Sequence, residues 1–311
     1  MTVAGTSAVL DESSPGTPGT PGTPGSSDAA QASAWAAPAQ PSAVSVVAAL
    51  ARREVVRFAR QRSRLMGALL TPVVFWLLLG FGLDRAVSFD GAPVAGASGG
   101  SGEAGSGGLG YLDYFLPGSL LLVVLFSSIF STMTLIEDRR DGFLESVLAS
   151  PASRGAIVLG RVLGGAGVAW GQAGLFLLLA PLFGVSVGPG ALVLAWLASG
   201  VAALGLTAAG VWTAWGMTST SAYHAVMNLV LMPAWLLSGA VFPVGSAAGP
   251  IRAVMLANPM TYAQAWVARV MHGPASGVGL GAATWLCAGV VVGGALLAVA
   301  GAVRAAHRPS A

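Results

Sequence analysis

Apolar residues gather into six long runs along this chain. The runs cover residues 65–83, 115–136, 157–183, 191–215, 223–242 and 278–303. Residues 162–251, ninety in all, contain no Asp, Glu, Lys or Arg. Because a helix needs about 20 residues to cross about 30 Å of hydrocarbon, each run is about long enough to span a membrane. The pattern predicts an all-α integral membrane protein with six transmembrane helices.

Composition and charge fix the expected orientation. Only 9% of the residues are charged, whereas soluble domains carry about 25%. All fifteen basic residues are arginines, and twelve of them face the cytosol if the N-terminus does, leaving Arg85, Arg252 and Arg269 outside. This is the positive-inside asymmetry. We therefore expect a multi-pass protein of a bacterial inner membrane, with both termini cytosolic and no nucleic-acid partner.

The N-terminal region divides into two parts. Residues 1–42 are rich in Pro, Gly, Thr, Ser and Ala, which predicts a disordered cytosolic tail. Residues 43–64 have helical periodicity, with Arg53, Arg57, Arg60 and Arg64 on one face. We expect an amphipathic interface helix there. Its arginines either bind anionic headgroups or act as a positive-inside anchor for the next span.

The segments that follow the first and fifth runs are expected outside the membrane. Residues 84–110 form a Gly-rich loop, and residues 244–277 hold two short apolar stretches, 251–257 and 260–272, separated by Asn258-Pro259. Each stretch is too short to cross, which favours re-entrant helices or an interfacial helical hairpin. Residues 304–311 form the predicted cytosolic C-terminal tail. Within the third run, the GxxxG pairs Gly160–Gly164 and Gly167–Gly171 predict close helix packing inside the chain.

Within the charge-free residues 162–251, few side chains are polar. On polarity alone, the candidates for a substrate path are Gln172, Tyr223, His224, Asn228 and Ser238. A proton relay through the lone histidine is disfavoured, and so is a protease built on Ser98 in a low-complexity loop. No spacing of His, Cys, Asp and Glu indicates a metal site. Because the chain has no lysine, it lacks the P-loop motif, so any ATP hydrolysis requires a separate polypeptide.

The one dense group of charges lies between the second and third runs. Residues 137–154 read EDRRDGFLESVLASPASR. Apolar residues within this segment form a stripe on a short helix that Pro151 ends, with acidic residues near its start. The stripe consists of Phe143, Leu144, Val147 and Leu148. A short amphipathic helix between two spans suits docking, and its mixed charges favour a protein partner over anionic lipid.

At these residues the chain resembles type-2 ABC transporter permeases, notably the daunorubicin-resistance-like exporters. Supporting motifs are Asp-Tyr-Phe-Leu-Pro-Gly at 113–118, Asn-Pro-Met-Thr-Tyr at 258–262 and Thr71-Pro72. The similarity runs from about residue 43 to 303 and is weakest at 84–110. It implies a six-span permease domain over 65–303, with a cytosolic coupling helix after span two and re-entrant helices before span six.

The resemblance also implies partners and site residues. Two permease copies, as a homodimer, would work with ATPase subunits that bind ATP and Mg²⁺, so this chain itself would bind no cofactor. The coupling residues implied are Glu137, Arg139, Arg140, Gly142, Phe143, Leu144, Glu145, Val147, Leu148, Pro151 and Arg154. The expected function is ATP-driven export of an apolar or amphipathic solute, such as a drug, lipid or polysaccharide. The alternative is a secondary transporter or channel without an ATPase.

Overall fold

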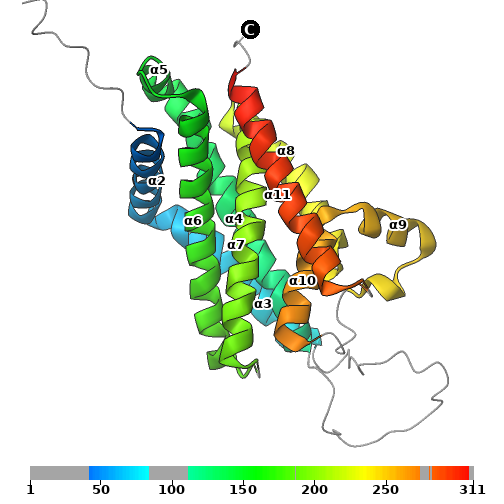
Figure 1. The fold of residues 1–311 in the computed structure, drawn as a ribbon. Coiled ribbons are helices and arrows are strands. Elements are labelled where there is room, and N and C mark those ends of the chain that lie inside the picture. Colours follow the sequence, from blue (N-terminus) through cyan, green and yellow to red (C-terminus); the bar gives the residue numbers. More distant parts are fainter. Residues whose placement is uncertain (1–41, 84–110, 186, 274–279, 281, 308–311) are drawn as a thin grey trace, which may run out of the picture. The chain divides into compact units, whose positions relative to one another are not determined.

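The computed structural model describes residues 42–83, 111–185, 187–273, 280 and 282–307. Pro41–Ala311 form one compact unit, and its described residues contain helices and no strands (Figure 1). The expected tail before Ser42, the 84–110 loop with Ser98, and residues 308–311 lie outside the described residues. The long helices are α2 Ala43–Arg60, α3 Arg62–Leu83, α4 Tyr111–Arg140, α6 Arg154–Leu179, α7 Pro189–Ala214, α8 Thr220–Trp235, α10 Pro259–His272 and α11 Thr284–His307. The short ones are α5 Phe143–Leu148, α9 Gly249–Ala257, the 3₁₀ turns η1 Ala180–Phe183 and η3 Val244–Ser246, and the π-helical η2 Leu236–Ala240.

Five helices of the described residues are long and apolar enough to cross a membrane: α3, α4, α6 extended by η1, α7 and α11. This confirms an all-α integral membrane protein. The fifth predicted run, 223–242, is divided between α8 and η2, so the count of six spans stays a prediction. Pro233 lies inside α8, and Gly239 has a φ of 87°. The 16 residues of α8 alone reach about 24 Å, and η2 continues the segment by 5 residues.

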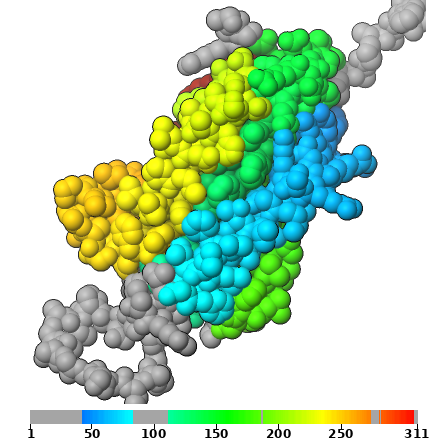
Figure 2. All heavy atoms as spheres, turned by 180° about the vertical axis from the view of Figure 1, so that it is seen from behind, coloured from blue at the N-terminus to red at the C-terminus, as the bar shows by residue number. Residues whose placement is uncertain are grey.

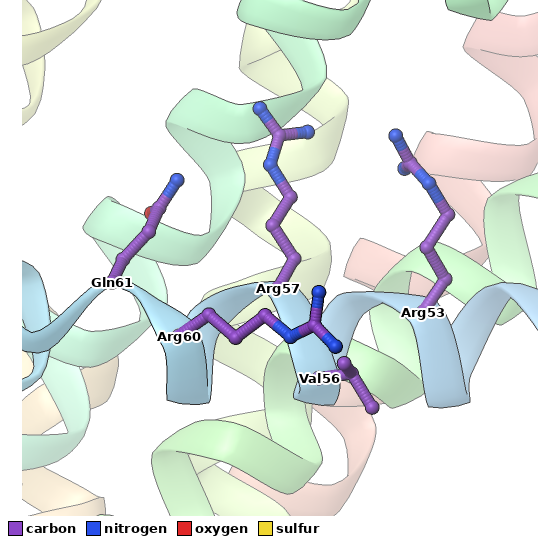
Figure 3. Close-up of a pocket in the computed structure, with 5 residues that line it drawn as sticks. All are labelled: Arg53, Val56, Arg57, Arg60 and Gln61. Atoms are coloured by element: carbon purple, nitrogen blue, oxygen red, sulfur yellow. The ribbon is translucent and has the colours of Figure 1, made fainter.

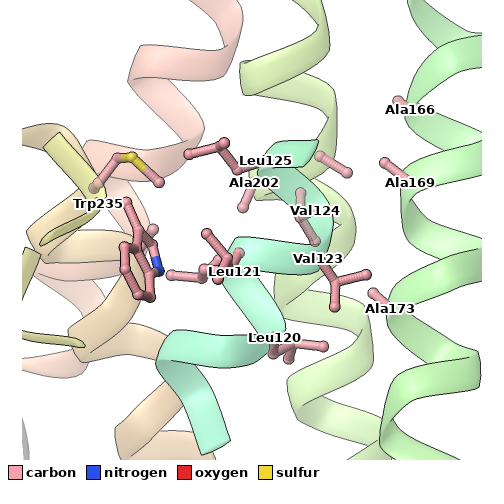
Figure 4. Packing of buried hydrophobic residues seen from close by; sticks show 14 of the residues in the cluster. Leu120, Leu121, Val123, Val124, Leu125, Ala166, Ala169, Ala173, Ala202 and Trp235 are labelled. Carbon is pink, nitrogen blue, oxygen red and sulfur yellow. The ribbon is translucent and has the colours of Figure 1, made fainter. Parts of the chain in front are cut away.

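Helix α4 is the centre of the bundle. In its most apolar stretch 83% of the residues are buried, against 22% in α3 and in α11. Bulky side chains of α4, such as Leu120 and Val123, face small residues of α6, including Ala169 and Ala173, while Trp235 lies on the opposite side of α4 (Figure 4). Small residues let neighbouring backbones approach closely in lipid. The alternation of large and small residues therefore sets the spacing around α4.

Helix α2 packs against α6 where α6 has glycine. A Cβ at Gly160 would lie 2.8 Å from the Cβ of Leu50, and one at Gly164 would lie 2.9 Å from the Cα of Ala51. Gly167 and Gly171 have no such neighbour among the described residues. The first GxxxG pair therefore forms a packing surface within the chain, as its spacing indicates.

The C-terminal end predicted for the 43–64 helix is wrong, because the structure divides this segment between two helices. Helix α2 ends at Arg60, Gln61 leaves the helical region with φ −90° and ψ 73°, and α3 begins at Arg62. The backbone N–H of Gln61 donates to the carbonyl oxygen of Phe58. This turn redirects the chain, so the two helices follow different paths across the bundle.

A pair of tryptophans joins α6 to α7. The rings of Trp170 and Trp196 stack with centroids 4.2 Å apart. Each indole N–H donates to the other residue's carbonyl oxygen, at 2.8 and 3.0 Å. Gly174 and Gly200 lie beside these rings, where a Cβ would come within about 3 Å of an indole nitrogen. This contact fixes the two helices at the end opposite α5.

The two short stretches before the last span form helices as predicted. Asn258 separates α9 from α10: its side chain accepts from the N–H of Met260 and donates to the carbonyl oxygen of Ala234 at 2.5 Å. Helix α10 is largely buried against neighbouring helices, and the His272 ring lies 3.1 Å from the carbonyl oxygen of Asp113. Their assignment as re-entrant or interfacial helices stays a prediction. The sixth predicted span folds as α11, which continues through residue 307.

The glycine contacts yield a paired prediction. Gly164→Ala should lower the free energy of unfolding by about 1 to 3 kcal/mol, because the new methyl group overlaps the backbone of α2. Gly167→Ala, on the same helix and in open space, should be neutral or stabilising by up to about 1 kcal/mol. Thermal unfolding in detergent measures both. Equal effects would show that α2 does not pack as described.

Candidate cytosolic coupling site

A sharp turn between α4 and α6 presents the short helix α5 at one end of the bundle. Gly142 has a φ of 71°, a conformation that favours glycine, and it directly precedes Phe143, the first residue of α5. Helix α5 ends at Leu148, ahead of Pro151. The Ser153 hydroxyl then caps α6 by accepting from the N–H of Ala156. The predicted short helix is therefore present and ends before the proline.

The apolar stripe of α5 faces mainly inward. Leu144 is 2% exposed, and Leu148 packs against the same core. The guanidinium carbon of Arg53 lies 3.7 Å from the ring centroid of Phe143. Val147 is half-buried, whereas Glu145 is exposed. The stripe thus anchors α5 to its own chain, and the face left for a partner is mostly polar.

Three of the predicted coupling arginines hold backbone carbonyls at this end of the bundle. Arg139 donates to the carbonyl oxygens of Trp215 and Met217 at 2.8 and 3.2 Å, and Arg140 donates to that of Thr218 at 3.0 Å. Arg154 donates to the carbonyl oxygen of Ala306 at 3.3 Å. These acceptors lie at the C-terminal ends of α7 and α11 or just after them, where carbonyls lack helical partners. A further role for these arginines in ion pairs with a partner protein stays a prediction.

Next to α5 lies a partly buried group of charges that we call the Asp138 cluster. It comprises Arg53, Glu54, Arg57, Arg64, Glu137, Asp138 and Arg161. The Asp138 carboxylate is 2% exposed and forms ion pairs with Arg53 at 2.9 Å and with Arg57 and Arg161. The residues come from α2, α3, α4 and α6. One carboxylate therefore ties three helices together.

The deepest part of the cluster joins α2 to α6. Arg161 is 5% exposed and donates to Glu54, which is 1% exposed, at 3.0 Å. It also donates to the Thr134 hydroxyl at 3.3 Å. Closer to the surface, Glu137 binds Arg57 at 3.1 Å and also pairs with Arg64. Buried charges persist in such a setting when each has a partner.

These contacts change the interpretation of the N-terminal helix. Arg53, Arg57 and Arg64 bind carboxylates of α4, so they are not free to act as headgroup ligands as the sequence suggested. Sequence reasoning also missed Glu54 and Arg161. A signal was present: Arg161 falls inside an apolar run, and Glu54 is the one acidic residue in 43–64. An ionisable residue inside a span calls for a partner.

The structure does not bring the five residues predicted to line a substrate path together at one site, although two of them, His224 and Asn228, are hydrogen-bonded. Gln172 of α6 bonds with Ser127 of α4 and donates to the Leu65 carbonyl oxygen at 3.3 Å. Tyr223 is buried beside Gly210. Their path role stays a prediction.

The remaining three lie elsewhere on α8 and η2. His224 and Asn228 are half-buried, and a hydrogen bond of 2.9 Å joins the Asn228 side-chain nitrogen to Nδ1 of His224. The histidine ring also packs against the ring of Phe130. The Ser238 hydroxyl is buried and donates to the Trp235 carbonyl oxygen at 2.6 Å. Most of these polar groups are satisfied by neighbours in their own part of the fold.

Comparison with known families decides the assignment. Residues 45–271 match the model of the ABC-2 type transporter membrane family, which is more than half of the chain. The chain belongs to the ABC-2 type transporter family. A search of curated proteins finds no match. ABC-2 membrane subunits are permease components of ABC transporters and in general work with an ABC ATPase. The matched region contains α5 and the whole Asp138 cluster, so both belong to the permease domain.

The ion pairs of Asp138 predict how its substitution changes the stability of the protein. Asp138→Asn should destabilise the protein by about 3 to 5 kcal/mol, because three guanidinium groups lose a shared buried carboxylate. Asp141→Asn, three residues on and exposed, should change stability by less than about 0.5 kcal/mol. Thermal unfolding of both variants in one detergent compares them. A similar melting temperature for the two would contradict the buried cluster.

Proposed function

We propose that this chain is the permease subunit of an ATP-driven exporter in a bacterial inner membrane, acting with a separate ATPase that binds ATP and Mg²⁺. The observation that carries the proposal is α5, a short helix fixed to the bundle by its apolar side while Glu145 remains exposed. Its exposed residues are charged or small and polar, which suits a soluble protein partner. The absence of lysine from the chain agrees with a separate ATPase.

The contacts beneath α5 suggest how work from the ATPase reaches the membrane. Leu144 ties α5 to the core, and Arg53 joins it to α2 through Phe143. Asp138, one turn before α5, binds α2 and α6. A force on α5 is therefore applied to three helices at once. We infer that ATP hydrolysis tilts these helices as a group and opens a path for the solute.

One face of the unit is suited to contact with a second copy of the chain. Figure 2 shows α3 and α8 on this face with α4 between them. Both outer helices carry exposed apolar side chains, including Leu78 and Phe81 on α3 and Leu229 and Val230 on α8. We propose a homodimer with the path between the copies and with His224 and Asn228 of α8 near it. These side chains suit an apolar or amphipathic solute and offer no fixed charge for an ionic one.

The orientation follows from the arginines. Arg154 binds the last turn of α11, and Arg53 binds the end of α4, so the predicted cytosolic ends of these helices gather together. We propose that this end, with α5 and both termini of the chain, faces the cytosol.

Co-purification with the ATPase subunit tests the docking role. Glu145→Arg should reduce the ATPase recovered by roughly tenfold or more, because it places a like charge against a complementary surface. The exposed side chain leaves the fold intact. The matched control is Arg252→Glu, a charge reversal at another exposed position, on α9, which should retain the ATPase.

ATP-dependent transport in vesicles gives the second readout. The Glu145→Arg variant should insert normally and lose transport together with ATPase binding. Normal ATPase recovery and normal transport in this variant would contradict the docking role of α5. Uphill transport by the chain alone, driven by a proton gradient, would instead support a secondary transporter.

A further inference from the structure

An open groove lies on the surface of α2 where the chain turns into α3. Its volume is about 380 Å³, within the range of roughly 300 to 1,000 Å³ typical of small-molecule sites. The lining residues are Arg53, Val56, Arg57, Arg60 and Gln61 (Figure 3). Three of the five are arginines. The ATPase-facing helix α5 contributes nothing to this lining.

The groove carries more positive charge than the chain neutralises. The adjoining Asp138 cluster sets four arginines against three carboxylates: Arg53, Arg57, Arg64 and Arg161 against Glu54, Glu137 and Asp138. Arg60 adds another charge and forms no ion pair with any described residue. Its side chain lies along α2 beside Val56, whereas Arg53 and Arg57 point to the other side (Figure 3). The net positive charge favours an anionic ligand.

The groove also contains an unused polar atom. The side-chain oxygen Oε1 of Gln61 is buried and has no hydrogen-bond partner among the described residues. Buried polar atoms are nearly always hydrogen-bonded, so this oxygen retains the capacity to accept from a further donor. A ligand with a hydroxyl donor would bond Oε1 while its anionic oxygens bind Arg60, the lining arginine without an ion pair among the described residues.

The surroundings of the groove are those of a lipid. Val55 and Val56 are 44% and 41% exposed at its border. Directly below begins α3, a candidate membrane span whose Met66 and Leu70 are 55% and 52% exposed. The groove therefore lies where a charged segment meets an apolar helix. In a membrane this is the level of the phosphate groups, with acyl chains next to α3.

We propose that this groove binds the headgroup of an anionic glycerophospholipid. Arg60 binds the phosphate, Gln61 binds a headgroup hydroxyl, and the acyl chains lie along Met66 and Leu70. Such a lipid would stabilise the turn between α2 and α3 from the membrane side, next to the contacts that the Asp138 cluster makes. The site is independent of ATPase docking, so either proposal can fail alone.

Lipid binding to the full-length chain tests the proposal. The purified protein in an uncharged detergent is titrated with phosphatidylglycerol or phosphatidylcholine, and bound lipid is measured by native mass spectrometry. We expect phosphatidylglycerol to bind more tightly than phosphatidylcholine. Arg60→Gln should lower the affinity for phosphatidylglycerol about fivefold, which corresponds to the binding free energy of about one arginine at the membrane surface. Gln61→Leu should also weaken binding. Arg252→Gln, an exposed arginine on α9, is the matched control and should bind like the wild type.

Three outcomes would overturn the proposal. Equal affinity for the two lipids would remove the role of charge. Equal losses in Arg60→Gln and Arg252→Gln would show a general charge effect with no site at the groove. Displacement of phosphatidylglycerol by inorganic phosphate at the same concentration would assign the groove to a soluble anion.

Discussion

The pairing of charges at the membrane boundary is the constraint on which this structure depends. An unpaired charge inside hydrocarbon costs at least about 2.5 kcal/mol, so Arg161, inside the span formed by α6, requires a partner. Glu54 and Asp138 supply it from two other helices. Because the partners come from α2 and α4, neutralising one arginine also fixes where both helices lie. The position of α5, which follows α4 directly, is then set by the same ion pairs.

Close packing of small residues makes this pairing possible. The Glu54 side chain reaches α6 because Gly160 and Gly164 let α2 approach its backbone. Farther along, Gly174 and Gly200 make room for the stacked tryptophans that join α6 and α7. Ion pairs near one end of α6 and aromatic stacking toward the other hold it at two points. A force applied at α5 therefore reaches a bundle that can move as a unit.

Much of the fold follows from sequence patterns, because length and apolarity decide which segments cross a membrane. Residues 115–136 fall within α4, 157–183 are covered by α6 and the 3₁₀ turn η1, and 191–214 fall within α7. Asn258-Pro259 separates α9 from α10 as expected. Predictions from local sequence features failed where contacts between distant segments determine the structure. The inward-facing Leu144 depends on core partners distant in sequence. The resemblance located the coupling loop, whereas Glu54 could be found only by asking what neutralises Arg161.

Photo-crosslinking from two exposed serines tests the central claim, that α5 faces the ATPase. Ser146 lies on α5 and Ser246 on η3, at opposite ends of α4. Each is replaced by cysteine and labelled with a cysteine-reactive benzophenone, while the native Cys287 is buried. With the ATPase subunit co-expressed, we expect an adduct between the two subunits from Ser146→Cys and none from Ser246→Cys. An ATPase adduct from Ser246→Cys, with none from Ser146→Cys, would contradict the account.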